Sequence, residues 1–167
     1  PTLIRNPKWI SLISPVFKLI EVFPGYREQD ISLPFLVFFS TFFGILIGDA
    51  GYGAVYFFLT FWLNKKLGKK VPNKSYFLLF YLLSSCAVIW GLLTGTIFGQ
   101  EWLVKTGWIK PLVPALNDAK AMQTFCFFLG ALHLTIAHSW QAVIKFPSLA
   151  ALADVGWAGI LWSAFLL

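Results

Sequence analysis

Residues 33–64 form an apolar run whose only charged side chain is Asp49, and this run limits what the chain can fold into. A single helix over these residues would be roughly 46 Å long at about 1.5 Å per residue, whereas bilayer hydrocarbon is about 30 Å thick. At its centre the run reads GDAGYG, residues 48–53. The sequence therefore predicts a transmembrane helical hairpin with its turn at 48–53.

Composition places the chain among integral membrane proteins. Hydrophobic residues make up 58% of it and charged residues 12%, against about 25% charged residues in soluble domains. Lysines gather at the edges of apolar stretches, where anionic lipid and insertion topology account for them, so no nucleic-acid partner is predicted. Cys86 and Cys126 lie in apolar stretches without metal or disulfide spacing. No catalytic, cofactor-binding or metal-binding residue is predicted.

The fold class expected is all-α, a polytopic transmembrane bundle. Because the chain starts on Pro1 and stops at Leu167 inside an apolar run, we expect it to be a fragment. The expected segments are a cytosolic, interfacial connector at 1–32, the hairpin at 33–64, a basic cytosolic loop at 65–74, a transmembrane helix at 75–98, an external loop at 99–118, a transmembrane helix at 119–144 and a truncated one at 148–167.

The distribution of basic residues favours the hairpin over a single long span. With a hairpin, ten of the thirteen Lys and Arg residues lie on the cytosolic side, whereas a single span divides them seven to six. Cytosolic loops of membrane proteins carry the excess of Lys and Arg.

The expected turn of the hairpin consists of Gly48, Asp49, Gly51, Tyr52 and Gly53. Gly48 can adopt the left-handed conformation that ends a helix, and Asp49 can then accept hydrogen bonds from the free amides of the next helix. A cap of this kind predicts that Asn or Ser at position 49 is tolerated. The alternative is that the charge of Asp49 serves ion transfer or catalysis.

Three glycines four residues apart, Gly91, Gly95 and Gly99, predict one smooth helical face for close helix packing. On the next stretch His133 and His138 are five residues apart, about 140° around a helix, so they are not a chelating pair. Interhelical hydrogen bonds or a hydrated ion path are the two interpretations of these histidines.

Asp154 is expected near the start of the last helix, where the helix dipole favours a negative charge. Together with Asp49 it raises the hypothesis of an intramembrane aspartyl protease. Those enzymes carry Gly-x-Gly-Asp and Tyr-Asp motifs, but here Leu46 occupies the first glycine position and Ala153 precedes Asp154. The protease pattern therefore fails at both aspartates.

Taken together, these motifs resemble the membrane domain, in its N-terminal half, of subunit I (subunit a in eukaryotes) of V-type and archaeal A-type rotary ATPases. The most specific match is GDAGYG at 48–53 after a Phe-rich helix. The other matching residues are Asn6, Pro7, Lys8, Pro24, Tyr26, Glu28, Asp30, Pro34, Gly44, Gly95, Phe98, Gly99, Gly130 and His133.

The resemblance implies a stator that holds a proteolipid ring and connects to peripheral stalk subunits while protons or sodium ions cross the membrane. It implies an integral protein of the prokaryotic plasma membrane, or of vacuolar membranes in a eukaryote. The family's essential arginine cannot be placed, because Arg5 and Arg27 both lie outside the apolar stretches. We expect these residues to be scaffold, with some helices lining the outer half-channel. A small-solute transporter with a discontinuous helix is the alternative.

Overall fold

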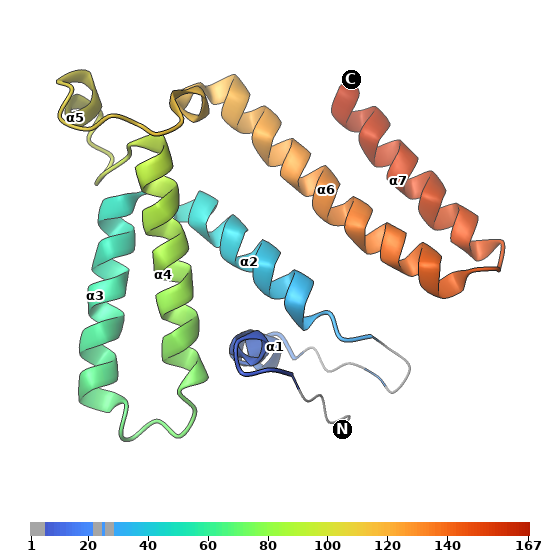
Figure 1. The fold of residues 1–167 in the computed structure, drawn as a ribbon, viewed down its shortest axis with the longest axis horizontal. Helices are drawn as coiled ribbons and strands as arrows, with labels where there is room; N and C mark the ends of the chain where they lie inside the picture. The colour runs from blue at the N-terminus through green and yellow to red at the C-terminus, as the bar shows by residue number, and fades with distance from the viewer. Residues whose placement is uncertain (1–5, 22–24, 26–28) are drawn as a thin grey trace. The chain divides into compact units, whose positions relative to one another are not determined.

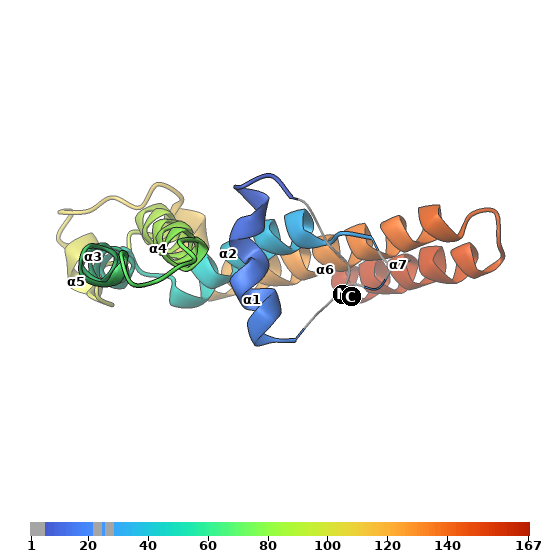
Figure 2. The same cartoon turned by 90° about the horizontal axis from the view of Figure 1, so that it is seen from below.

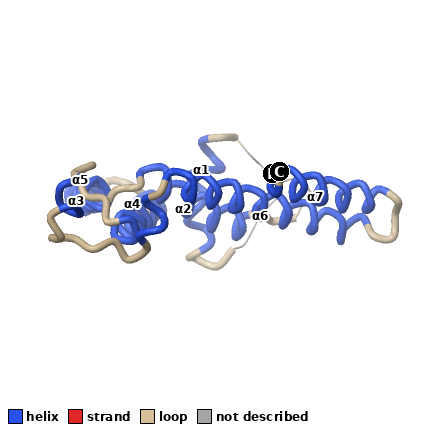
Figure 3. Tube along the Cα trace, turned by 90° about the horizontal axis from the view of Figure 1, so that it is seen from above, coloured by secondary structure: helices blue, strands red, loops and turns tan. Residues whose placement is uncertain are grey.

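The computed structural model describes residues 6–21, 25 and 29–167, and every regular element in that part of the chain is a helix (Figure 3). The all-α fold predicted from the sequence is therefore confirmed. The elements are η1 (Ile10–Ile13), α1 (Ser14–Leu19), α2 (Ser32–Ile47), α3 (Ala50–Leu67), α4 (Ser75–Thr94), α5 (Glu101–Lys105), η2 (Pro114–Asn117), α6 (Ala119–Lys145) and α7 (Ala150–Leu166).

Helices α4 and α6 are long and apolar enough to cross a membrane. The α2–α3 pair meets the same test together, but it is bent by 119° at its break. By length and composition the described chain thus offers two spans, or three if the bent pair counts as one.

Residues 1–114 form one compact unit, and α4 is its central helix. Both α2 and α3 pack against α4 and diverge from each other at their junction (Figure 1). Four buried side chains form the apolar core where η1, α2 and α4 meet: Ile13, Leu36, Leu79 and Leu83. The connector segment therefore contributes to this core through η1 and α1, and Figure 2 shows α1 beside α2.

The start of α2 is set by a local hydrogen bond. The Asp30 carboxylate accepts from the amide of Ser32 at 2.9 Å and from its hydroxyl. Burial raises the pKa of Asp30, but these hydrogen bonds outweigh it and hold the pKa below its usual range. The predicted family residues Pro24, Tyr26 and Glu28 lie outside the described residues, as do Arg5 and Arg27.

Residues 115–167 form a second unit, in which α6 and α7 pack side by side as an antiparallel pair (Figure 1). Aromatic side chains fill part of their contact: the ring of Phe128 on α6 lies 6.0 Å from the rings of both Trp162 and Phe165 on α7. Of an 18-residue apolar segment of α6, only 6% is buried within the chain.

Two predicted boundaries differ from the structure. The helix expected over 75–98 ends at Thr94, because Gly95 adopts a left-handed conformation with φ +72°. The loop expected at 99–118 contains two short helices, α5 and η2.

Candidate functional site at the break between α2 and α3

The break itself takes two residues. Gly48 is left-handed (φ +61°) and its amide bonds the Gly44 carbonyl at 2.9 Å, which ends α2. Asp49 is extended, and its Oδ1 accepts from the Tyr52 amide at 3.0 Å, which caps α3. Residues 50–53, expected to be part of the turn, are therefore the first turn of α3. The turn is shorter than predicted because Asp49, the residue directly after the Gly48 that ends α2, is already the N-cap of α3.

The carboxylate of Asp49 also reaches a loop that is distant in sequence. Its Oδ1 accepts from the amide of Phe98 at 2.9 Å, and its Oδ2 accepts from the amide of Gly99 at 2.8 Å. The side chain is buried, and the neighbouring Ala50 amide donates to the carbonyl of Thr96 at 2.9 Å. Asp49 thus fastens the α2–α3 break to the loop that follows α4.

Both carboxylate oxygens are used, and this changes the expected effect of substitution. Asn has one acceptor oxygen, and its amide nitrogen is a donor. An Asn at position 49 would face the Gly99 amide with a donor in place of Oδ2. The sequence shows only the local cap, which Asn could also form. The additional bond to the Gly99 amide gives a reason to expect a cost, and tolerance of Asn at position 49 stays a prediction.

The glycines of the break bring backbones together. A Cβ added to Gly51 would lie 2.7 Å from the ring of Phe98, and one added to Gly53 would lie 2.7 Å from the Val88 amide nitrogen on α4. The rings of Tyr52 and Phe98 also meet edge to face, with centroids 5.4 Å apart. The first turn of α3 is thereby held against α4 and the following loop.

Of the three glycines predicted to share a helical face, only Gly91 lies within α4. A Cβ added to it would lie 1.9 Å from the Ala50 amide nitrogen, the closest such approach among the described glycines. Gly95 and Gly99 are both left-handed and belong to the loop. The predicted stripe is corrected accordingly, because a left-handed glycine after α4 ends the helical repeat.

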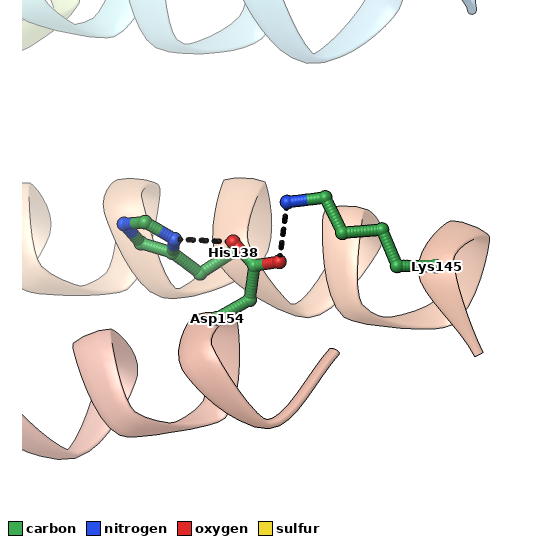
Figure 4. Close-up of polar contacts among 3 residues, drawn as sticks. All are labelled: His138, Lys145 and Asp154. Carbon is green, nitrogen blue, oxygen red and sulfur yellow. Dashed lines mark hydrogen bonds and ion pairs between the residues drawn. The ribbon is translucent and has the colours of Figure 1, made fainter. Parts of the chain in front are cut away.

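A second polar cluster lies between α6 and α7 (Figure 4). The Asp154 carboxylate bonds His138 Nδ1 at 3.2 Å and Lys145 Nζ at 2.7 Å. The His138 ring also stacks near Trp157, with centroids 6.4 Å apart. Asp154 is buried although Lys145 remains partly exposed. The structure thus brings together two residues of the predicted polar path, while His133 lies five residues earlier on α6.

Sequence reasoning missed Lys145 as a partner of Asp154. A signal was available, because Lys145 and His138 are seven residues apart and therefore share one face of α6. Within the described part of the chain no group of three or more His, Cys, Asp or Glu side chains could hold a metal ion.

The chain is similar to several curated proteins. It is 36% identical over 166 residues to the V-type ATP synthase subunit I 1 of Treponema pallidum, covering 93% of this chain and 26% of that protein. It is 33% identical over 172 residues to the V-type ATP synthase subunit I of Borreliella burgdorferi, covering 94% and 27%. An A-type ATP synthase subunit I of Halobacterium salinarum is 28% identical over 108 residues, covering 65% and 15%.

The chain therefore spans about a quarter of the length of the first two relatives. No family model and no solved structure matches it. The resemblance to subunit I, inferred from the sequence, is confirmed by these relatives.

Proposed function

We propose that this chain, a homologue of subunit I of V-type and A-type ATP synthases, is part of the membrane sector of a rotary ATPase and serves there as stator scaffold. The observation that carries the proposal is the similarity to two subunit I proteins over more than nine tenths of the chain. Its partners would be the proteolipid ring, the peripheral stalk subunits and membrane lipid. Its location would be the prokaryotic plasma membrane, and it would support transport of protons or sodium ions coupled to ATP.

The network around Asp49 supports a scaffolding role. A stator must resist the sideways load of a turning ring, so its helices need fixed relative positions. Here one carboxylate links the end of α2, the start of α3 and the loop after α4 through three backbone amides. Asp is a short side chain, and three bonds to one buried carboxylate hold it in a single orientation, so the segments it joins keep fixed relative positions.

A polar path is a second role for the same protein, and the cluster on α6 and α7 favours it. Ionisable side chains within apolar helices are costly and often mark ion pathways. His138, Asp154 and Lys145 form a connected set there, and His133 lies on the same helix. We propose that these side chains line part of a hydrated ion path near the C-terminal end of α6, with the essential arginine supplied elsewhere.

The alternative of a small-solute transporter fits the break less well. Transporters with discontinuous helices bind substrate at half-helix ends, where backbone amides and carbonyls point at the ligand. At this break the Tyr52 amide bonds Asp49 and the Ala50 amide bonds the Thr96 carbonyl. Two of the amides that could hold a substrate, those of Ala50 and Tyr52, therefore already have intramolecular partners.

Affinity purification of the tagged full-length protein from its own membranes tests the proposal. We expect it to copurify with a proteolipid ring and with ATP-hydrolysing subunits, and its deletion should abolish ATP-driven ion uptake in membrane vesicles. A protein that purifies alone and takes up a small solute after reconstitution would support the transporter instead.

The orientation of the bent pair needs its own measurement. The positive-inside bias predicts that the loop at 65–74 faces the cytosol. A single Cys at Lys69, in a variant whose native cysteines are replaced, should react with a membrane-impermeant thiol reagent only from that side. Labelling from the outside would show that α2 and α3 form one broken span.

A further inference from the structure

The loop between α3 and α4 concentrates positive charge without any compensating acid. From Ala50 to Gln100 the sequence contains no Asp or Glu. Every basic residue in that stretch falls at 65–74, and all are exposed: Lys65, Lys66, Lys69, Lys70 and Lys74. Among the described residues none of these lysines takes part in an ion pair. The charge of the loop is therefore available to an external anion.

Helix dipoles explain only part of this charge. Lys65 and Lys66 lie in the last turn of α3, where a positive charge is favourable. Lys69 and Lys70 lie beyond that helix, and Lys74 is the N-cap residue of α4, where the dipole disfavours a positive charge. The cap bond there is supplied by Asn73 Oδ1, which accepts from the Ser75 amide at 2.9 Å. Three of the five lysines thus have no stabilising role within the fold.

Aromatic side chains flank the loop at the same end of the two helices. The Trp62 ring is 54% exposed and lies 4.8 Å below the ammonium group of Lys66. Tyr76, in the first turn of α4, is also exposed. Trp and Tyr favour the headgroup level of a bilayer, where one end of the ring is apolar and the other is wet. By its length and composition α4 could cross a membrane, and a crossing α4 would place its N-terminal end and this loop at that level.

We propose that residues 62–76 form a binding site for the headgroups of anionic phospholipids. Lys69, Lys70 and Lys74 would contact the headgroup phosphates, while Trp62 and Tyr76 would lie against the upper acyl chains. The aromatic residues favour lipid over an acidic protein partner, because an acidic protein surface gives no reason for exposed rings at both helix ends. The site depends on α4 crossing a membrane and not on the rotary ATPase assignment.

Photo-crosslinking in bilayers tests this site directly. The full-length protein is reconstituted with a photoreactive phosphatidylglycerol or a matched photoreactive phosphatidylcholine, and the labelled peptides are mapped. We expect phosphatidylglycerol to label the 62–76 region preferentially. In the triple variant with Lys69→Gln, Lys70→Gln and Lys74→Gln, the preference for phosphatidylglycerol should fall at least tenfold. Each lysine near an anionic membrane surface strengthens binding about fivefold.

A matched control replaces three exposed lysines outside the 62–76 region. The triple variant with Lys105→Gln, Lys110→Gln and Lys120→Gln removes the same charge and should leave labelling of the 62–76 region unchanged. Raising NaCl should weaken the preference, because salt screens exposed charges. Inorganic phosphate at the same ionic strength should compete no better than chloride.

Equal labelling by the two lipids at 62–76 would overturn the proposal, and so would equal loss in both triple variants. Specific competition by inorganic phosphate would show a free-anion site instead. Protection of the loop by a copurifying acidic protein would show a protein interface. Thermal stability of the two variants, measured in detergent, should match that of the unmodified protein, since the substituted side chains are exposed.

Discussion

The two helix pairs of this chain, α3–α4 and α6–α7, are both apolar and both antiparallel, yet they are held together differently. In α3–α4, glycines bring the backbones into direct contact, and a buried carboxylate bonds three amides. In α6–α7, no described glycine faces a neighbour: a Cβ added to Gly130, Gly156 or Gly159 would meet nothing within 4 Å.

Burial follows the same division. An 18-residue apolar segment of α4, which packs against α2 and η1 as well as α3, is 44% buried within the chain, whereas that of α6, which packs against α7, is 6% buried. In lipid the hydrophobic effect does not drive helices together, so close packing and polar contacts decide association. The comparison indicates that α3–α4 is fixed by backbone proximity, whereas α6–α7 depends on side chains and leaves most of α6 for lipid or other protein.

Gly91→Leu is the substitution that should break the first pair most severely. The added side chain would start 1.9 Å from the Ala50 amide nitrogen, and backbone cannot move aside cheaply. We expect a loss of about 3 kcal/mol or more, at the upper end of overpacking costs, seen as failure to assemble or a large drop in thermal stability. Gly130→Leu is the control, expected to cost within about 0.5 kcal/mol. A comparable cost at Gly130 would reveal a close partner for α6 in the full-length protein.

Asp49→Leu should come next, because it leaves three amides without their acceptor. An unsatisfied buried donor costs about 1–3 kcal/mol. Asn keeps one acceptor oxygen, so the stability of Asp49→Asn should fall between that of Asp49→Leu and that of the unmodified protein. The matched control is Asp118→Asn at the start of α6, where the carboxylate accepts from the Ala121 amide alone. Thermal unfolding in detergent ranks the variants. Full stability of Asp49→Asn would mean that the Gly99 bond contributes nothing.

Full assembly of Asp49→Asn with loss of ion pumping would identify a different role. In that outcome the complex would still hydrolyse ATP, and the charge of Asp49 would be serving ion transfer rather than structure. The stability and transport measurements on this one variant therefore separate the two interpretations of the residue.

The polar cluster of the second pair should have a smaller effect. Lys145→Met and Asp154→Asn each break a contact between α6 and α7. We expect their effects to be non-additive in a double-mutant cycle, with coupling weaker than the Asp49→Leu loss because the Lys145 side chain is 41% exposed. Lys120→Met, which removes an exposed charge at the other end of α6, is the control. Additive effects would show that the ion pair does not hold the two helices together.

Alanine at helical glycines should have effects of opposite sign in the two pairs, and the smallest effect should be that of Gly159→Ala. Gly159→Ala on α7 meets open space and should stabilise its helix by up to about 1 kcal/mol. Gly53→Ala on α3 would bring its methyl group 2.7 Å from the Val88 amide nitrogen and should destabilise. Thermal stabilities of the two variants check the signs, and the same sign in both would weaken the comparison.

Local features of the fold could be predicted from sequence, because their causes lie within a few residues. The helix break follows from Gly48 and Asp49, since a left-handed glycine stops one helix and an aspartate caps the next. The apolar stretches likewise led to helices at nearly the expected places, apart from the C-terminal end of α4.

The hydrogen bonds between Asp49 and the loop after α4 could not be predicted in the same way. The residues whose amides bond Asp49 include Phe98 and Gly99, 49 and 50 positions away. Spacing of glycines at 91, 95 and 99 suggested a helical face, but two of them serve the loop that receives the Asp49 carboxylate. Periodicity does not distinguish a glycine needed for close packing from one needed for positive φ.

The sequence by itself determined the membrane class, the helical composition and the position of the break, because these depend on hydrophobicity and on neighbouring residues. The tertiary structure alone decided that α4 packs between α2 and α3, that Asp49 bonds the loop after α4 and that Lys145 joins His138 at Asp154. The physical reason is that hydrogen bonds between distant segments depend on where packing brings their backbones, and no local pattern records that position.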